Sequence, residues 1–352
     1  MDIALIGPPL SGKSTLFQAV SGHAPTHAGG EVRAAVKVPD PRVDWLAEKF
    51  HSKKTTYASF NVLDMPGFSQ ETPSQQAEFR RHMGTLRQCD GLVAVVRAFE
   101  NAGLPAYRNK VDPVRDIQEL RTEMMFADLE QVANRIDRLK KQLTKPSKTH
   151  DQDKHELALM ERCQKALESE TPLSEVLRDP EEAKLVSSFG FLTQKPLLVV
   201  LNVSEADASK PVEKEMPFAA ATMSLCASIE AELAQLSGGD QQTFLAEYGL
   251  TEPVRGRFLR ACMHAIGLIS FLTTGEDESR AWPIRKGSHA VEAAGVIHSD
   301  LARGFIRAET VAFDDLKAAG DMKAARAAGK IRLEGKDYVV KDGDVLNIRF
   351  SI

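Results

Sequence analysis

The chain has 352 residues and a formal net charge of -4; 43% of its residues are hydrophobic and 27% are charged. This length suits two or three domains, and the composition is typical of a soluble globular protein. The charge excludes a chain held to nucleic acid by an overall positive charge, but it leaves room for a local basic patch.

The N-terminus lacks a basic segment followed by a signal-like apolar run, and no stretch approaches the roughly 18 apolar residues that span a bilayer. We therefore expect a cytoplasmic protein without a membrane partner. The four cysteines lie far apart and form no C-x-x-C pair, which argues against a zinc site or a disulfide framework and fits a reducing compartment. They are Cys89, Cys163, Cys226 and Cys262.

The first motif follows the first apolar run, IALI at 3–6, and reads GPPLSGKST. Its G-x-x-x-x-G-K-S spacing is that of a phosphate-binding loop, in which backbone N–H groups and a helix N-terminus bind phosphate. We expect Lys13 to reach the β- and γ-phosphates and the Ser14 hydroxyl to bind Mg²⁺. The predicted loop comprises Gly7, Pro8, Pro9, Leu10, Ser11, Gly12, Lys13, Ser14 and Thr15.

Four short apolar runs alternate with helical patterns and predict buried strands. This alternation favours an α/β fold with a mainly parallel sheet and helices on both faces. Ligands of such sheets bind beyond the carboxyl ends of the strands, which is where the polar motifs of this chain lie. The runs are IALI (3–6), FNVLD (60–64), GLVAVV (91–96) and PLLVVLN (196–202).

A second motif, LDMPG at 63–67, ends the second predicted strand. Asp64 fits the carboxylate that holds Mg²⁺ through water, and the Gly67 N–H fits a contact to the γ-phosphate. The segment that follows would then be ordered by that phosphate and released when it leaves.

Two further motifs concern the base. GTPases of this class commonly carry N-K-x-D, whose Asp pairs with the guanine donors, but this chain reads NVSE at 202–205. Val203 replaces the Lys, and Glu205 places its carboxylate on a longer side chain, so guanine selectivity is not assured. The base-reading residues are predicted to be Asn202, Val203 and Glu205, with Cys226, Ala227 and Ser228 from the small-residue turn in SLCASIEAEL (224–233).

Between the third and fourth strands, LEQVANRIDRLKKQL (129–143) has the apolar spacing of a coiled-coil seam. A polar break containing Pro146 and a second helical pattern predict an antiparallel helical hairpin. Its tip holds seven Lys or Arg against three Asp between residues 131 and 155, either as a solvated face or as a contact to nucleic acid phosphates. The basic residues are Arg135, Arg138, Lys140, Lys141, Lys145, Lys148 and Lys154.

The last eighty or so residues have a different character. KIRLEGKDYVVKDGDVLNIRFSI contains short alternating runs, and the EGKD and KDGD segments between them are hairpin signals. We expect a small α+β module without catalytic residues. Neither His289 nor His298 has a Cys, Asp or Ser at a sequence spacing typical of a catalytic or metal site, and both are expected to be structural or surface residues.

With these motifs in this order, the chain resembles the YchF/Obg-like ATPase family of translation-factor-related P-loop NTPases over nearly its whole length. Segments such as KPLLVVLNVSEAD (195–207) and AAGVIHSDLARGFIRAE (293–309) are close to what that family carries. The resemblance implies a GTPase-like P-loop NTPase domain (1–110 and 190–270), a helical coiled-coil insertion (111–189) and a C-terminal α+β module of the TGS β-grasp type (271–352). It also implies Mg²⁺, ATP accepted at least as well as GTP, slow hydrolysis, and ribosome or ribosomal RNA binding through the hairpin and the TGS module.

Four positions bear on hydrolysis. Phe68 stands where many GTPases carry a water-orienting Gln, as it does in the family, and an apolar side chain cannot hydrogen-bond that water. Leu10 and Ser11 replace the family's Asn and Val, and Leu10 offers no ligand to a monovalent cation, which argues against potassium stimulation. Ala28 falls at the family's switch Thr, with Thr26 two residues away, and SQETPSQQAEFRRHM (69–83) replaces a glycine-rich run.

Two functions follow from these residues. The first is a slow ATPase, with GTP as a further substrate, that associates with ribosomes and uses Lys13, Asp64 and Gly67 around the phosphates. The second is a nucleotide-binding adaptor for ribosomes or RNA that has negligible turnover, which Leu10, Ala28 and Phe68 favour. Glu205 argues against a third, a guanine-specific switch. The sequence defines neither the oligomeric state nor the biological process.

Overall fold

The structure is a computed structural model that describes residues 1–23, 30–69, 72, 77, 79–145, 149–210, 216 and 218–351. Contacts within the chain define two compact units: Met1–Ala34 with Asn61–Arg257, and Ala35–Phe60 with Phe258–Ile352. Residues 35–60 thus group with the C-terminal part of the chain, whereas the sequence suggested that they belong to the nucleotide-binding part. The three-part division expected from the sequence stays a prediction.

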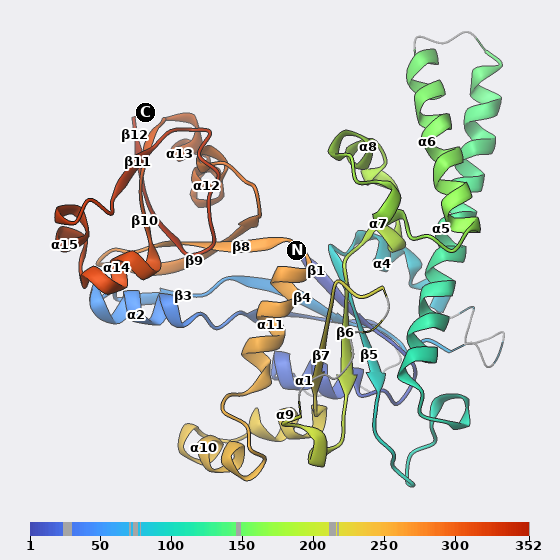
Figure 1. Ribbon diagram of the computed structural model, residues 1–352, viewed down its shortest axis with the longest axis horizontal. Helices are drawn as coiled ribbons and strands as arrows, with labels where there is room; N and C mark the ends of the chain where they lie inside the picture. The colour runs from blue at the N-terminus through green and yellow to red at the C-terminus, as the bar shows by residue number, and fades with distance from the viewer. Residues whose placement is uncertain are drawn as a thin grey trace. The chain divides into compact units, whose positions relative to one another are not determined.

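The described residues of the first unit form a six-stranded sheet in the order β2-β4-β1-β5-β6-β7 (Figure 1). Strand β1 pairs in parallel with β4 and β5, β5 with β6, and β6 with β7. The predicted α/β fold with a mainly parallel sheet is therefore confirmed, and the four predicted strands are β1, β4, β5 and β6. The bounds are β1 Asp2–Ile6, β2 Val32–Lys37, β4 Ser59–Asp64, β5 Gly91–Arg97, β6 Leu197–Asn202 and β7 Ala221–Leu225.

Burial explains why the central strands read as continuous apolar runs. Strand β5 is buried along its whole length, and in β1 the alternating residues Ile3 and Leu5 are as buried as Ala4 and Ile6. Because neighbouring side chains of a strand point to opposite faces, both faces of the sheet are covered. Ala4 and Ile6 pack in one cluster with Ile117 and Leu120 of helix α5 and with Leu86 of α4.

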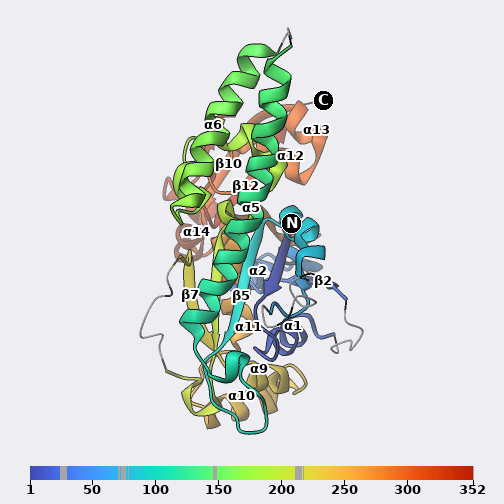
Figure 2. The ribbon, with the colours of Figure 1, turned by 90° about the vertical axis from the view of Figure 1, so that its right-hand side faces the viewer.

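The helical hairpin is confirmed. Helix α5 begins after Asp112, whose side chain accepts a hydrogen bond from the Arg115 N–H, and Pro113 occupies the first helical position. Helices α5 and α6 lie side by side (Figure 2), and Val132, Ile136 and Leu139 pack with Leu159 and Met160 across the seam. The helices of this unit are α1 Lys13–Ser21, α4 Met83–Gln88, α5 Pro113–Leu143, α6 His150–Glu168, α7 Leu173–Val176, α8 Pro180–Leu185, α9 Ala227–Leu233 and α10 Gly238–Glu247; α11 Val254–Ala265 begins in it and ends in the second unit.

The second unit has a mixed sheet in the order β11-β10-β12-β8-β9-β3, and its C-terminal part has the α+β character expected from the sequence. The hairpins expected at EGKD and KDGD are wrong, because β11 and β12 both pair antiparallel with β10, one on each side of it. Elements of this unit are α2 Pro41–Lys49, β3 Lys54–Thr56, β8 Leu268–Thr273, β9 Glu278–Arg285, α12 Ala290–Ile297, α13 Ser299–Arg303, β10 Phe305–Ala312, α14 Phe313–Ala319, α15 Met322–Ala327, β11 Arg332–Glu334 and β12 Asp344–Phe350.

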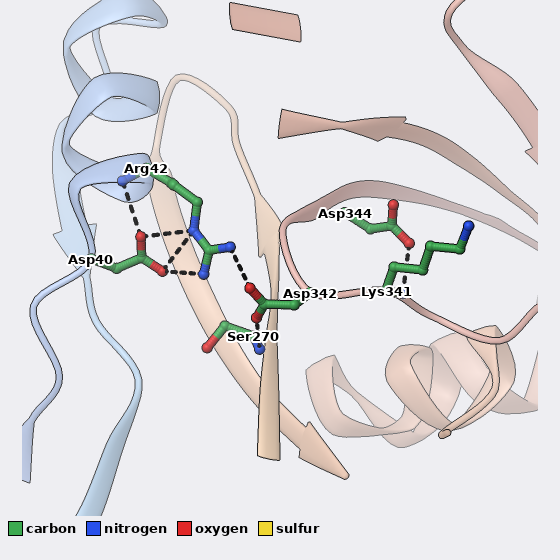
Figure 3. Close-up of polar contacts among 6 residues, drawn as sticks. All are labelled: Asp40, Arg42, Ser270, Lys341, Asp342 and Asp344. Atoms are coloured by element: carbon green, nitrogen blue, oxygen red, sulfur yellow. Dashed lines mark hydrogen bonds and ion pairs between the residues drawn. The ribbon is translucent and has the colours of Figure 1, made fainter. Parts of the chain in front are cut away.

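An ion-pair network shows why residues 35–60 group with the C-terminal part of the chain (Figure 3). Arg42, at the start of α2, lies 2.8 Å from an Asp40 oxygen through Nη2 and 2.7 Å from Asp342 through Nη1. Asp342 also accepts a hydrogen bond of 2.8 Å from the Ser270 N–H of β8, and Asp344 accepts one from the Lys341 N–H. One guanidinium therefore joins α2 to the turn before β12 within this unit.

Among the described residues, no helix is both long and apolar enough to cross a membrane. The four cysteines are all free and buried. Cys226, expected at the base site, is one of them, and its position is described below.

Candidate nucleotide-binding site

The phosphate-binding loop leads directly from β1 into α1. Gly12 is the residue before α1 and has a φ of 95°, and no side chain caps the helix. A Cβ at Gly12 would lie 2.2 Å from Nδ2 of Asn202, so only glycine fits at this close approach. The first N–H groups of α1 are consequently left without a side-chain acceptor, as an anion-binding helix N-terminus requires.

Lys13 is held inside this loop. Its Nζ donates a hydrogen bond of 2.9 Å to the Pro8 carbonyl, and the residue is only 6% exposed. Burial lowers the pKa of Lys13 to about 8, against the attraction of the Asp64 carboxylate. A carbonyl dipole compensates the charge of a buried ammonium group only in part, so an anion bound beside it would be stabilised. The phosphates of a nucleotide would supply that negative charge.

Asp64 and Ser14 fit a magnesium ion. Asp64 lies at the end of β4 and shares a side-chain hydrogen bond with Ser14, and burial raises the pKa of its carboxyl group. Its Oδ1 is buried and has no hydrogen-bond partner among the residues that the structure describes. A buried carboxylate oxygen without a donor, beside a hydroxyl at a helix N-terminus, suits a cation that keeps most of its water and shares the phosphates.

The segment after Asp64 approaches the phosphate loop closely. A Cβ at Gly67 would lie 3.0 Å from the N, Cα and Cγ atoms of Pro9, and the Phe68 N–H donates a hydrogen bond of 2.9 Å to the Gly7 carbonyl. The Phe68 side chain is 1% exposed and packs edge-on against Phe79 with a centroid distance of 4.8 Å. Phe68 thus anchors the segment in the core through its buried ring.

Asn202 joins three of the predicted motifs. Its Nδ2 donates a hydrogen bond of 3.0 Å to the Ser11 carbonyl, and its Oδ1 accepts one of 2.9 Å from the Ala227 N–H. Both ends of the amide are therefore engaged within the protein, and the residue is 5% exposed. Asn202 positions the phosphate loop against the turn at 226–228, which was predicted to lie at the base edge.

A cavity of about 610 Å³ opens beside these residues. Glu205 is exposed at its lining, whereas Val203 packs its side chain toward a hydrophobic cluster with Ile229 and Leu233. The lining also brings together all six residues of the predicted base site with part of the phosphate loop. It comprises Leu10, Gly12, Thr15, Phe99, Glu100, Asn101, Leu104, Asn202, Val203, Ser204, Glu205, Ala206, Cys226, Ala227 and Ser228.

One wall of this cavity was missed from the sequence. Phe99, Glu100, Asn101 and Leu104 come from the loop after β5, and no motif marked them. The rule that ligands bind at the carboxyl ends of parallel strands would have found this loop, since β5 is one of the two central strands and AFENAGLP follows it directly.

Some predicted positions lie outside the described residues. These are Ala28 and Thr26 of the first switch segment, Lys148 of the hairpin tip, and part of the stretch 69–83. The replacement of the switch Thr therefore stays a prediction.

Leu10 lies in the phosphate loop with a φ of 59°, a left-handed conformation, and it is 50% exposed. Such a conformation costs a leucine about 1 kcal/mol, and asparagine tolerates it better. We expect Leu10→Asn to raise the free energy of unfolding by up to about 1 kcal/mol in urea titrations, because it relieves strain without removing buried contacts. Leu10→Val is the matched control, and its β-branched side chain should lower stability; if both variants shift stability in the same direction, backbone strain is not the cause.

Ser11, the next residue of the loop, is buried, unlike the exposed Leu10. It is 1% exposed, and its Oγ makes no hydrogen bond among the described residues. A buried hydroxyl without a partner lowers stability, so Ser11 carries a cost that an apolar side chain of similar size would not.

Two family profiles match the chain. The profile described as 50S ribosome-binding GTPase covers residues 2–135, and YchF-GTPase_C, described as a protein of unknown function, covers 268–351. "Ribosome-binding ATPase YchF" of Bacillus subtilis (strain 168) is 39% identical, and the match covers 100% of both chains. The protein of the same name from Escherichia coli O157:H7 is 35% identical over 99% of this chain and 98% of that protein.

A solved structure agrees with these sequence matches. The structure of the Schizosaccharomyces pombe YchF GTPase aligns with a TM-score of 0.84 and 27% identity, over 99% of this chain and 97% of that one. The relatives and the shared fold lead to one conclusion. The chain belongs to the YchF family.

Proposed function

We propose that this protein is a slow ATPase that binds Mg²⁺·ATP in the cavity beside the phosphate loop and associates with ribosomes. The observation that carries the proposal is that the phosphate loop, the stretch 202–206 and the turn at 226–228 line one cavity. Lys13 and the N-terminus of α1 belong to that loop, Asp64 has an oxygen with no partner among the described residues, and Asn202 ties the loop to the base side. Bound Mg²⁺ would supply charge stabilisation to the phosphates, held by Ser14 and Asp64.

Hydrolysis is expected to be slow because the second switch segment offers no water-orienting side chain at Phe68. The Phe68 ring is buried against Phe79, and its N–H is already bonded to the Gly7 carbonyl. The attacking water must then be oriented by another backbone group, the substrate or a partner. Gly67 remains the backbone N–H proposed to contact the γ-phosphate.

The base side supports ATP over an exclusive preference for GTP. Guanine selectivity in related folds depends on a short carboxylate, and Glu205 is longer and exposed at the cavity lining. Val203 packs against the cluster around Ile229, and its apolar side chain offers no charge to the base. We therefore propose ATP as the principal ligand and keep GTP as a second one.

Ribosome association rests on the names of the relatives and on the charges of the hairpin. Several curated relatives are named ribosome-binding ATPases. Two of the predicted basic residues are paired within the hairpin: Arg135 lies 2.7 Å from Glu156, and Lys140 lies 3.2 Å from Glu161. Four others are exposed, and no ion pair engages them in the described part of the hairpin: Arg138, Lys141 and Lys145 on α5 and Lys154 on α6.

Replacing Arg138, Lys141 and Lys145 together by Gln tests this contact. If these charges bind ribosomal RNA phosphates, the slope of log affinity against log salt should fall by about 2 in cosedimentation with ribosomes. The paired residues Arg135 and Lys140, replaced by Gln, provide a control that should change the slope less. An unchanged slope in the triple variant would remove the hairpin from the proposed ribosome contact.

The second candidate function is a nucleotide-holding adaptor without turnover. The buried Phe68 ring and the absence of a side-chain ligand at Leu10 favour it. In both cases we propose a cytoplasmic protein, because its relatives are named for ribosome binding.

A further inference from the structure

We propose that Arg97 is a positioning residue that holds the loop of residues 98–105 as the wall of the nucleobase pocket. The inference rests on the proposed function, since it assigns the base to the cavity lined by Phe99, Asn101 and Leu104. Arg97 itself does not line that cavity. It would act on the base only through the loop.

The guanidinium group of Arg97 is bonded to four carbonyl groups of this loop. Nε donates to the Phe99 carbonyl at 3.0 Å, and Nη2 donates to the Asn101 carbonyl at 3.3 Å. Nη1 donates to the carbonyls of Leu104 and Pro105 at 3.2 and 3.3 Å. The loop therefore curls around one planar group, with its carbonyl oxygens turned toward the guanidinium.

The charge of Arg97 is compensated by this loop and not by a carboxylate of the described residues. The residue is 6% exposed at the end of β5, where it pairs in register with Asn202 of β6. Among the described residues, no carboxylate forms an ion pair with it, although buried arginines usually have such a partner. Four carbonyl dipoles and the Phe99 ring, 4.7 Å from the guanidinium carbon, take that place.

The loop has little else to hold it. Leu104 is 39% exposed, Asn101 and Glu100 are exposed, and beyond Ala98 the other bonds are short-range ones such as the Gly103 N–H to Oδ1 of Asn101 at 2.8 Å. The start of the loop is tied to β6 by the Ala98 N–H, which donates to the Asn202 carbonyl at 2.8 Å. The wall is thus anchored at position 202 of β6, and the side chain of the same residue, Asn202, positions the other side of the pocket.

The chemistry of arginine matters at this position. Its planar fork presents five N–H donors in fixed directions, which suits several carbonyls in one plane. A lysine keeps the charge but concentrates three donors at one point, so it cannot serve four separated carbonyls. We therefore expect Arg97→Lys to loosen the wall and the places of Phe99 and Leu104 while leaving the phosphate loop intact.

The test compares two ligands on the full-length protein. Equilibrium binding of Mg²⁺·ATP and of inorganic tripolyphosphate with Mg²⁺ is measured by calorimetry for the wild type, Arg97→Lys and Arg115→Lys. Arg115 is a matched control, because its Nη2 also donates to two carbonyls, of Tyr107 and Lys110, in a segment that does not line the cavity. Lys13→Ala is included to test the phosphate site separately.

Arg97→Lys is expected to weaken ATP binding about tenfold, which corresponds to the free energy of one to two hydrogen bonds. Tripolyphosphate binding should be unchanged. Arg115→Lys should leave both unchanged. Equal weakening of both ligands, or no change for ATP, in a folded Arg97→Lys protein would overturn the proposal. If Lys13→Ala leaves ATP affinity unchanged, it is the proposed nucleotide site itself that fails.

Discussion

Lys13→Ala is expected to lower the affinity for ATP at least about a hundredfold, since charge-assisted bonds to phosphate are among the strongest in proteins. The Lys13 amine is already inside the phosphate loop, bonded to the Pro8 carbonyl, and its pKa is lowered to about 8 by burial. A bound phosphate would replace the Pro8 carbonyl dipole, as the partner of the Lys13 amine, by a full negative charge. The substitution removes this cation and leaves Asp64 as the charge that faces the phosphates. Titration calorimetry with Mg²⁺·ATP measures the loss.

Lys195→Ala is the matched control for this prediction. Lys195 is a half-buried lysine whose pKa is likewise lowered by burial, and its Nζ donates to the Cys89 carbonyl, outside the phosphate loop. ATP affinity should therefore be unchanged in Lys195→Ala. Equal affinities of the Lys13→Ala variant and the wild type would contradict the assignment of the phosphate site.

Asp128→Ala is expected to lower the free energy of unfolding by about 3–5 kcal/mol, because it leaves the partly buried Arg87 cation and two backbone N–H groups without their acceptor. Asp128 lies on α5, is 0% exposed and accepts a bond of 2.8 Å from Nη1 of Arg87. It also accepts bonds from the N–H groups of Leu192 and Thr193 and from the Thr193 hydroxyl. The base of the hairpin is thereby joined to α4 and to the segment before β6. Urea unfolding followed by circular dichroism measures the effect.

Asp137→Ala is the control on the same helix. Asp137 is exposed, so its removal should change stability by less than about 0.5 kcal/mol. If both variants unfold at the same urea concentration, the Asp128 cluster does not hold the hairpin base.

The sequence predicted most of the sheet but missed its edges. The central strands are buried on both faces and therefore read as continuous apolar runs, whereas β2 and β7 alternate between buried and exposed residues. Both lie at the ends of the strand order, where one side lacks a neighbour. Their weak apolar content made them look like loops.

The C-terminal strands were found but paired wrongly. The turns at EGKD and KDGD suggested hairpins between consecutive runs, yet β11 and β12 lie on opposite sides of β10. Local turn residues define where the chain reverses, but they do not define which strand is the partner when a third strand lies nearby. A pairing between segments far apart in sequence cannot be read from turns alone.

The motif residues of the candidate site were predictable because they follow strand ends at fixed spacings. The structure brings Gly12, Asn202 and Ala227 together, as the order of motifs suggested. Two features had no signal in the sequence. Arg97 and Asp128 read as an ordinary arginine at a strand end and an ordinary aspartate on a helix. Only the structure shows that both are buried, that Arg97 binds the carbonyls of the loop that follows it, and that Asp128 binds backbone groups distant in sequence.

The central claim is that this site binds ATP and turns it over slowly. Single-turnover hydrolysis of Mg²⁺·ATP, with protein in excess and a parallel equilibrium binding titration, tests it most directly. The account predicts saturable ATP binding and slow turnover that is lost in Lys13→Ala. Binding without turnover above the Lys13→Ala background would contradict the ATPase function and leave an adaptor that holds ATP.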